Sequence, residues 1–152
     1  MTTRVTHATD LLRLAADQPD LGHSGWRQIT QEQVNLFADA TDDHQWIHVD
    51  PERAQAGPFG GPIAHGYLTL SLAPVFIAEI LQVEDIQMAM NYGLNKVRFP
   101  APVPVGARLR AGLQLKAAQT RGTAVEAVLT LTIQVEGRDR PACVADVVVL
   151  YR

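Results

Sequence analysis

The chain has 152 residues, of which 47% are hydrophobic and 19% are charged, with a formal net charge of −3. This length suits one compact domain with a core of its own and is short for two. A weak negative charge is unlike the basic surface of a nucleic-acid-binding protein, so we expect no nucleic-acid partner. The single cysteine, Cys143, excludes an internal disulfide and fits a reducing compartment; in its apolar run a thiol is usually inert.

Targeting and membrane segments are not expected. The first residues, Met1–His7, lack the apolar stretch of a secretory signal, and we therefore expect a cytoplasmic protein. The most apolar run, residues 63–81, contains His65, Pro74 and Glu79. These interruptions favour a buried core helix over a membrane span, so no membrane partner is expected.

The first thirty residues carry weak structural signals. Residues 9–16 favour a short helix with one apolar side, inside an N-terminal extension over residues 1–20. Residues 19–25 are turn-rich, and residues 26–29 are a candidate short strand. We interpret residues 1–152 as a single domain, because no linker or repeat divides them.

A well-marked helix begins after Thr30. Thr30 and Gln33 have the spacing of a capping box, in which each side chain accepts a hydrogen bond from the other residue's main chain. We expect this helix to end near Thr41, which puts residues 43–50 in a loop or a single irregular turn. Pro51 then suits the start of another short helical turn.

The middle of the chain combines a loop with the hydrophobic run. Residues 57–62, Gly-Pro-Phe-Gly-Gly-Pro, are expected to form a loop. From His65 to Leu81 nearly every position is apolar, which predicts a helix buried on most sides. Pro74 should kink this helix or divide it into two pieces.

In the second half, apolar and polar residues alternate. This period predicts strands over residues 86–99, 107–116, 125–135 and 143–151. Turns are expected over residues 119–123 and 136–141, and a change of phase at Asn95-Lys96 predicts a β-bulge. We therefore predict an α+β fold in which a long-stranded antiparallel sheet wraps around one central hydrophobic helix.

Two ionisable residues stand out between that first helix and the loop. Asp43 and His48 lie five positions apart, and the apolar neighbours of His48 indicate a partly buried ring. Histidine titrates near neutral pH, and an Asp in the same pocket can orient it and share its protons. The pair therefore favours acid–base chemistry on a carbonyl compound.

The neighbouring polar residues have structural explanations. Asp42 and His44 follow the helix exit and are expected to cap it or to face solvent, and we interpret Asp50 as structural. His44 and His48 are four apart, but Gln45 stands where a zinc-protease helix needs Glu. Because no third nitrogen or sulfur ligand follows at a recognisable spacing, we expect no metal.

The step from His65 to Gly66 opens the hydrophobic helix and supplies the other half of the candidate site. The first turn of a helix has unpaired N–H groups and a positive dipole end. A thioester or ester oxygen beside the Gly66 N–H would be stabilised as negative charge develops on it. The structural alternative is that glycine here permits close packing.

These residues resemble the MaoC-like dehydratases, a hotdog-fold family that includes (R)-specific enoyl-CoA hydratases and nodulation protein N-like proteins. The similarity covers residues 20–152 and is carried by residues 37–54, 57–60, 63–72 and 91–100, followed by Val105-Gly106. The family's motif of Asp, four residues and His falls on Asp43 and His48. Asp42 replaces its usual Gly, and Gln45-Trp46 replaces its frequent Asn-Pro, as in the nodulation protein N-like branch.

The resemblance implies a role for each matching residue in a single hotdog domain. Asp43 and His48 would be catalytic, Gly66 would be the oxyanion-hole glycine, and Ser71 would support the catalytic Asp. Further candidates for substrate binding are His65, Phe59, Gly60, Trp46, Lys96 and Arg98. Lys96 and Arg98, with Arg53, are candidates for CoA phosphates, although the favoured explanation of these three is ordinary solvated surface charge. No separate cofactor is implied, because CoA belongs to the substrate.

The implied activity is (R)-specific hydration of a trans-2-enoyl-CoA to an (R)-3-hydroxyacyl-CoA. Two alternatives stay open: a hotdog acyl-CoA thioesterase, which would release free CoA, and a non-catalytic acyl-CoA-binding module. The resemblance also implies a homodimer in which the two sheets continue edge to edge. Such pairing would cover an apolar edge strand that is otherwise an aggregation hazard.

Overall fold

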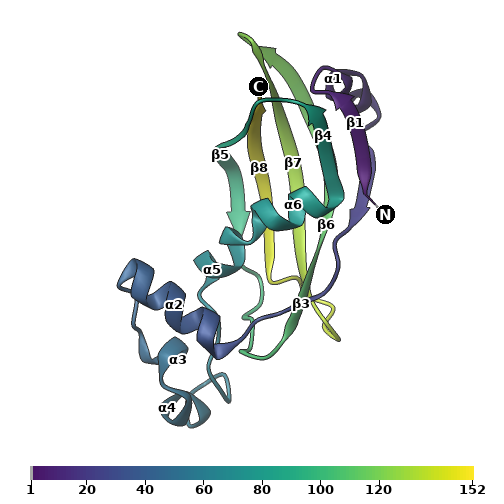
Figure 1. The fold of residues 1–152 in the computed structure, drawn as a ribbon. Helices are drawn as coiled ribbons and strands as arrows, with labels where there is room; N and C mark the ends of the chain where they lie inside the picture. The colour runs from purple at the N-terminus through teal and green to yellow at the C-terminus, as the bar shows by residue number, and fades with distance from the viewer. Residues whose placement is uncertain (1) are drawn as a thin grey trace.

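The computed structural model describes residues 2–152. Short helices fill the first half of the chain and long strands fill the second, as predicted (Figure 1). The elements in chain order are β1 (Thr3–His7), α1 (Asp10–Leu14), the 3-10 turn η1 (Ala15–Asp17), β2 (Asp20–His23), β3 (Arg27–Gln28), α2 (Gln31–Thr41), α3 (Trp46–Val49), α4 (Pro51–Gln55), α5 (Gly66–Ser71), α6 (Ala73–Ile80), β4 (Leu81–Asp85), β5 (Ala89–Arg98), β6 (Arg108–Arg121), β7 (Ala124–Val135) and β8 (Cys143–Tyr151).

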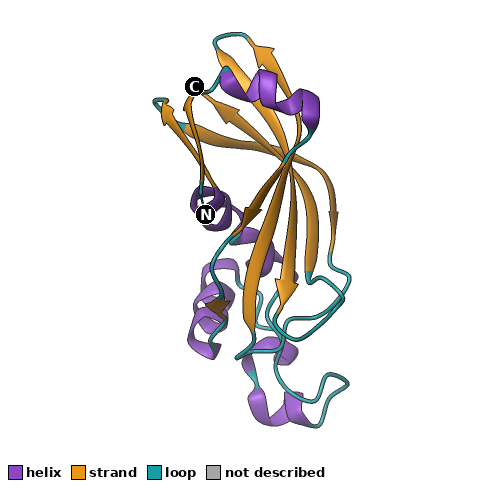
Figure 2. Cartoon of the chain, turned by 90° about the vertical axis from the view of Figure 1, so that its right-hand side faces the viewer, coloured by secondary structure: helices purple, strands orange, loops and turns teal. Residues whose placement is uncertain are grey.

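The principal sheet has the strand order β2-β6-β7-β8-β5, and the short β3 also pairs with β6. Every pairing in this sheet is antiparallel. The α5–α6 segment lies across the inner face of the curved sheet, whereas α2, α3 and α4 gather beyond one end of it (Figures 1 and 2). The predicted α+β fold, a sheet wrapped around a central helix, is therefore confirmed.

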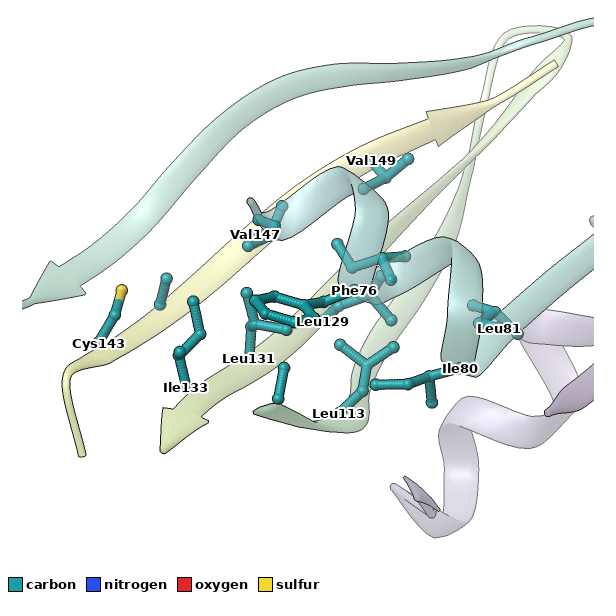
Figure 3. Close-up of a cluster of buried hydrophobic side chains, with 14 of the residues drawn as sticks. Phe76, Ile80, Leu81, Leu113, Leu129, Leu131, Ile133, Cys143, Val147 and Val149 are labelled. Carbon is teal, nitrogen blue, oxygen red and sulfur yellow. The ribbon is translucent and has the colours of Figure 1, made fainter. Parts of the chain in front are cut away.

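The core lies between α6 and the inner face of the sheet (Figure 3). Phe76 and Ile80 of α6 are fully buried together with Leu113, Leu129 and Leu131 of the sheet. Along β7 buried and half-buried residues alternate without interruption, as the sequence period predicts. Full burial of one side chain as large as Phe76 contributes about 1.5–3 kcal/mol.

The predicted hydrophobic helix is divided in two by its proline. Helix α5 ends at Ser71, Leu72 is the boundary residue, and α6 begins at Ala73 with Pro74 in its first turn. A proline ring clashes with the carbonyl four residues earlier, so one straight helix cannot continue through this point. Because of the break, α5 is a separate short piece whose first residue is Gly66.

The helix signals before the site are also confirmed. Thr30 Oγ1 accepts from the Gln33 main-chain N–H at 3.2 Å, and Gln33 Oε1 accepts from the Thr30 N–H at 3.0 Å. Helix α2 ends where Asp42 takes a left-handed conformation at φ 59°. Asp50 is structural as expected, because its Oδ1 accepts from the Arg53 N–H at 3.1 Å and caps α4.

Several features differ from the expectation. The N-terminal extension contains the expected helix but also β1, which pairs in parallel with β4; that two-stranded sheet, and β2, were not predicted. The turn expected over 119–123 is shorter, because β6 runs to Arg121 and Gly122 turns the chain at φ 59°. Strand β5 has the predicted bulge between Leu94 and Lys96 and a second irregularity between Asn91 and Gly93.

Among the described residues, no helix has the length and apolar character needed to cross a bilayer.

Candidate active site

Three ionisable side chains converge where α2, α3 and the start of α5 meet. Asp43 comes from the loop after α2, His48 from α3, and His65 is the residue immediately before α5. One carboxylate oxygen and one nitrogen from each ring all lie within 4.8 Å of one another. The structure therefore brings Asp43 and His48 together as predicted, and adds His65 to the same cluster.

The main chain sets the orientation of the buried His48 ring. Its Nδ1 lies 2.7 Å from the carbonyl oxygen of Ile63, and the Ile63 N–H in turn donates to the Ile47 carbonyl at 2.9 Å. A carbonyl oxygen only accepts, so Nδ1 carries the proton and Nε2 of the neutral ring has a free lone pair. This tautomer is the one that can take a proton from a water molecule.

Burial lowers the pKa of His48, and charge on His65 lowers it further; the hydrogen bond to Ile63 and the charge of Asp43 act in the opposite direction. The side chain is only 7% exposed, which explains why loss of hydration is the largest of these effects. At neutral pH the ring is therefore held in its uncharged, proton-accepting form.

His65 makes two contacts that the sequence did not reveal. Its Nε2–H donates to the main-chain carbonyl of Asp43 at 2.9 Å. Its ring lies stacked on His48, with centroids 3.8 Å apart and planes 25° apart, and Phe37 of α2 packs on it at 4.9 Å. The remaining nitrogen, Nδ1, is buried without a hydrogen-bond partner among residues 2–152.

The Asp43 carboxylate forms the open side of the cluster. Its side chain is 52% exposed, and Oδ2 lies 4.0 Å from His65 Nε2. Oδ1 accepts a long hydrogen bond of 3.4 Å from the Gln45 N–H. A ligand would therefore enter past Asp43 and meet the two buried rings behind it.

Gly66 begins α5 directly after His65. As the first helical residue, it has no intrahelical acceptor for its N–H. The Phe99 ring packs so closely on Gly66 that an added Cβ would lie 3.3 Å from two ring atoms. The absence of a side chain therefore permits this contact, which agrees with the close-packing reading and leaves the N–H at the helix start.

The geometry of the cluster is a poor fit to a metal ion. Imidazole binds a metal through a lone pair in the plane of the ring. Because the rings of His48 and His65 are stacked and nearly parallel, a single ion cannot lie in both ring planes.

The other residues of the 41–61 segment lie around the cluster rather than in it. His44 Nε2 bonds Asp39 at 2.8 Å on the surface, and this hydrogen bond raises the pKa of His44. Trp46 lies under the Arg53 guanidinium, 4.4 Å from it. The candidate binding residues Phe59 and Gly60 are exposed in the predicted loop, and their role stays a prediction.

The remaining candidates lie elsewhere. The Ser71 hydroxyl donates to the Tyr67 carbonyl at 2.6 Å within α5, rather than to the Asp43 carboxylate. Lys96 and Arg98 line a hollow on the outer face of the sheet with Lys116, and no residue of the cluster lines it. The roles of these residues in binding stay predictions.

Two apolar hollows adjoin each other between the α5–α6 segment and β5. One, of about 360 Å³, is lined by Ser71, Leu94 and neighbours. The other, of about 480 Å³, reaches the buried Tyr151, and both are lined by Pro74 and Asn91. Together they form an apolar path that starts at the end of α5 opposite Gly66.

Comparison with known proteins identifies the family. Residues 15–136 match the family described as MaoC like domain. The chain belongs to this family. Among MaoC-like proteins, it is 56% identical over 138 residues to 3-hydroxyacyl-thioester dehydratase Z of Mycobacterium tuberculosis, covering 90% of this chain and 91% of the relative. It is 44% identical over 130 residues to nodulation protein N of Rhizobium leguminosarum bv. viciae, covering 84% of this chain and 81% of the relative.

Solved structures of MaoC-like proteins show the same fold. The (R)-hydratase of A. caviae superposes with a TM-score of 0.70 at 27% identity, covering 84% of this chain and 93% of that chain. Both the predicted resemblance and the hotdog fold are thereby confirmed. These hydratase and dehydratase relatives identify this MaoC-like protein as a hydro-lyase.

Proposed function

We propose that the protein reversibly hydrates the double bond of a trans-2-enoyl-CoA thioester and forms an (R)-3-hydroxyacyl-CoA. The carrying observation is the cluster itself: the free Nε2 of His48 and the carboxylate of Asp43, next to the helix start at Gly66. The names of the mycobacterial dehydratase and the A. caviae hydratase support the same class of reaction.

In the hydration direction, a water molecule held between Asp43 and His48 attacks Cβ. The proton that the water gives up and the proton that Cα receives both pass through the pair, which returns to its starting protonation state. The pair can act as one acid–base unit, because a carboxylate oxygen of Asp43 and a ring nitrogen of His48 lie within 4.8 Å of each other. Because the same pair handles both protons, we expect water and proton to add to the same face of the double bond.

Gly66 would stabilise the negative charge that develops during this step. As the C–O bond forms at Cβ, the electron pair of the double bond moves toward the thioester oxygen. A main-chain N–H aimed at that oxygen is worth about 10²–10³-fold in rate in other oxyanion holes. The Gly66 N–H has no intrahelical acceptor and follows the cluster directly, which supports this role.

The adjoining apolar hollows suit the acyl chain of such a substrate. They run from Ser71 past Pro74 and Asn91 toward Tyr151, so an alkyl chain entering at the end of α5 would lie against their largely apolar lining. Each buried CH₂ contributes about 0.8 kcal/mol. The test is a series of trans-2-enoyl-CoA substrates, in which kcat/KM should rise with chain length until the path is filled.

The central experiment combines Asp43→Asn with His48→Gln and follows hydration of crotonyl-CoA. We expect loss of the hydration reaction, with the 3-hydroxyacyl product of the wild type identified as the R enantiomer. Unchanged hydration by the double variant would overturn the assignment of the pair. Release of free thiol without a 3-hydroxyacyl product would indicate a thioesterase instead, and binding without turnover would indicate a non-catalytic module.

We also propose a homodimer formed along β5, which is an edge strand of the principal sheet. Its apolar side chains Met90, Tyr92 and Leu94 are 41%, 52% and 45% exposed. Pairing the edges of two copies would satisfy the free main-chain groups and cover these side chains. Sedimentation should show a dimer that Leu94→Lys weakens, whereas Leu36→Lys, on the exposed face of α2, should leave it intact. A monomeric wild type would contradict the proposal.

A further inference from the structure

The geometry of the cluster assigns a role to His65 beyond contact with substrate. We propose that His65 is a positioning residue that holds both members of the acid–base pair, one through its Nε2–H and the other through its ring. This inference rests on the proposed function of Asp43 and His48. It concerns a residue that donates to Asp43 and stacks on His48 at the same time.

The first half of the role is the anchor on Asp43. Asp43 lies in the loop that follows the left-handed residue Asp42, and its side chain is half exposed. The main-chain hydrogen bond from His65 Nε2, at 2.9 Å, ties this loop to the start of α5. His65 is itself only 2% exposed, and Phe37 packs on its ring, so the surrounding side chains hold the anchor in position. The loop therefore presents the Asp43 carboxylate to the cluster at a fixed place.

The second half is the contact with His48. Stacking at 3.8 Å leaves the His48 ring enclosed between His65 and the Ile63 carbonyl, so its free Nε2 points in one direction. The titratable groups that act on this ring are His65 and Asp43; α2 presents the neutral Gln31, whose Nε2 donates to the His48 carbonyl at 2.8 Å. Repulsion between the two rings when both are protonated is therefore one cause of the lowered pKa of His48.

The third observation is that His65 has no second polar partner. Its Nδ1 is buried and makes no hydrogen bond within the described chain. If His65 only filled space, a phenyl ring at this position would leave activity almost unchanged. The role proposed here requires the Nε2–H donor, so Phe and Gln should behave differently at this position.

Two substitutions separate the parts of the role. His65→Gln keeps an N–H donor at the distance of Nε2 from the backbone but removes the ring. His65→Phe keeps a stacked ring but removes the donor. For His65→Phe we expect the high-pH plateau of kcat/KM for crotonyl-CoA hydration to fall about 10–100-fold, because Asp43 loses its anchor. For His65→Gln most of the plateau should remain.

The pH dependence supplies a readout that a merely structural role would not move. In His65→Gln, one cause of the lowered pKa of His48 is gone, so its NMR titration and the acid limb of kcat/KM should both shift to higher pH. The surface variant His44→Gln is the matched control, and it should change neither the high-pH plateau of kcat/KM nor the pH of its acid limb.

The outcomes are distinct. A folded His65→Phe variant with the wild-type plateau of kcat/KM would overturn the anchoring role. An equal fall of the plateau in His65→Gln and His65→Phe would overturn it too. If His65→Phe fails to fold, as judged by thermal melting, His65→Asn replaces it, because its shorter amide cannot reach the Asp43 carbonyl. An unchanged His48 titration in His65→Gln would overturn the coupling. The NMR titration needs no substrate, so failure of the positioning role is told apart from failure of the proposed hydration.

Discussion

The imidazole rings of His48 and His65 lie stacked with their centroids 3.8 Å apart, and each donates one N–H to a main-chain carbonyl. The carbonyls belong to Ile63 and Asp43 respectively. Main-chain acceptors thus set the tautomer of both rings, and the Asp43 carboxylate, with one long hydrogen bond from the Gln45 N–H, stays available for chemistry. The acid–base properties of this MaoC-like site follow from that arrangement.

Activity should fail at acidic pH through protonation of His48. The ring acts as a base in its neutral form, and burial lowers its pKa below the ordinary value of 6.5. We therefore expect kcat/KM to stay high at pH 7 and to fall only as the pH drops through the lowered pKa of His48. His48→Gln should reduce kcat by about 10²–10⁴-fold, the usual contribution of a positioned acid–base group. A pH–rate profile of hydration measures both effects, and an acid limb above 6.5 would contradict the first.

Stability should respond to pH with the same sign. Below the unfolded value of 6.5, an unfolded His48 binds a proton that the folded ring resists, so the free energy of unfolding decreases as pH falls through this range. Urea denaturation at several pH values between about 5 and 8 measures how the free energy of unfolding changes with pH. This window lies above the ordinary pKa values of Asp and Glu. His48→Gln should flatten this dependence. A slope identical to that of the wild type would show that His48 does not carry it.

Gly57 should tolerate no side chain, whereas Gly61 should tolerate one. A Cβ at Gly57 would lie 2.9 Å from the Trp46 ring, and that ring is held under Arg53. Gly57→Ala must displace the ring and should cost about 1–3 kcal/mol of stability, the usual cost of overpacking. At Gly61 an added Cβ meets nothing within 4 Å, so Gly61→Ala is the matched control. Equal melting temperatures for the two variants would rule out the predicted clash.

Cys143 should be unreactive in the native protein. It is fully buried at the start of β8, and burial raises the pKa of its thiol to about 11. The thiolate is the reactive form, so labelling with a thiol reagent at pH 7–8 should be slow in buffer and complete in denaturant. Cys143→Ala should also leave hydration of enoyl-CoA intact. Rapid native labelling would mean that the β8 end opens more readily than its packing indicates.

Patterns with a local cause were predictable. The capping box at Thr30 depends on residues three apart, and the break at Pro74 depends on a missing N–H and a clash one turn back. The alternation in β7 depends only on which face of a strand is buried. The bulge between Leu94 and Lys96 shows as a change of phase in the same alternation.

The parallel pair of β1 and β4 could not be predicted in this way. Each has only five residues, and Thr3 pairs with Leu81, about half the chain away. Short strands of this kind are stabilised by the partner they meet, which intrinsic preference and periodicity do not identify. Likewise, the placement of Lys96 and Arg98 on the outer face depends on the two irregularities of β5.

The candidate site divides along the same line. The sequence alone determined that an acid and a histidine, Asp43 and His48, lie on one short segment, and that a glycine opens a buried helix after His65. Only the tertiary structure decided that His65 lies against this segment, where it stacks on His48 and donates a hydrogen bond to the Asp43 carbonyl. The physical reason is that spacing along a chain reports local geometry, whereas a stacked ring and a main-chain hydrogen bond between distant residues exist only once the helices have packed.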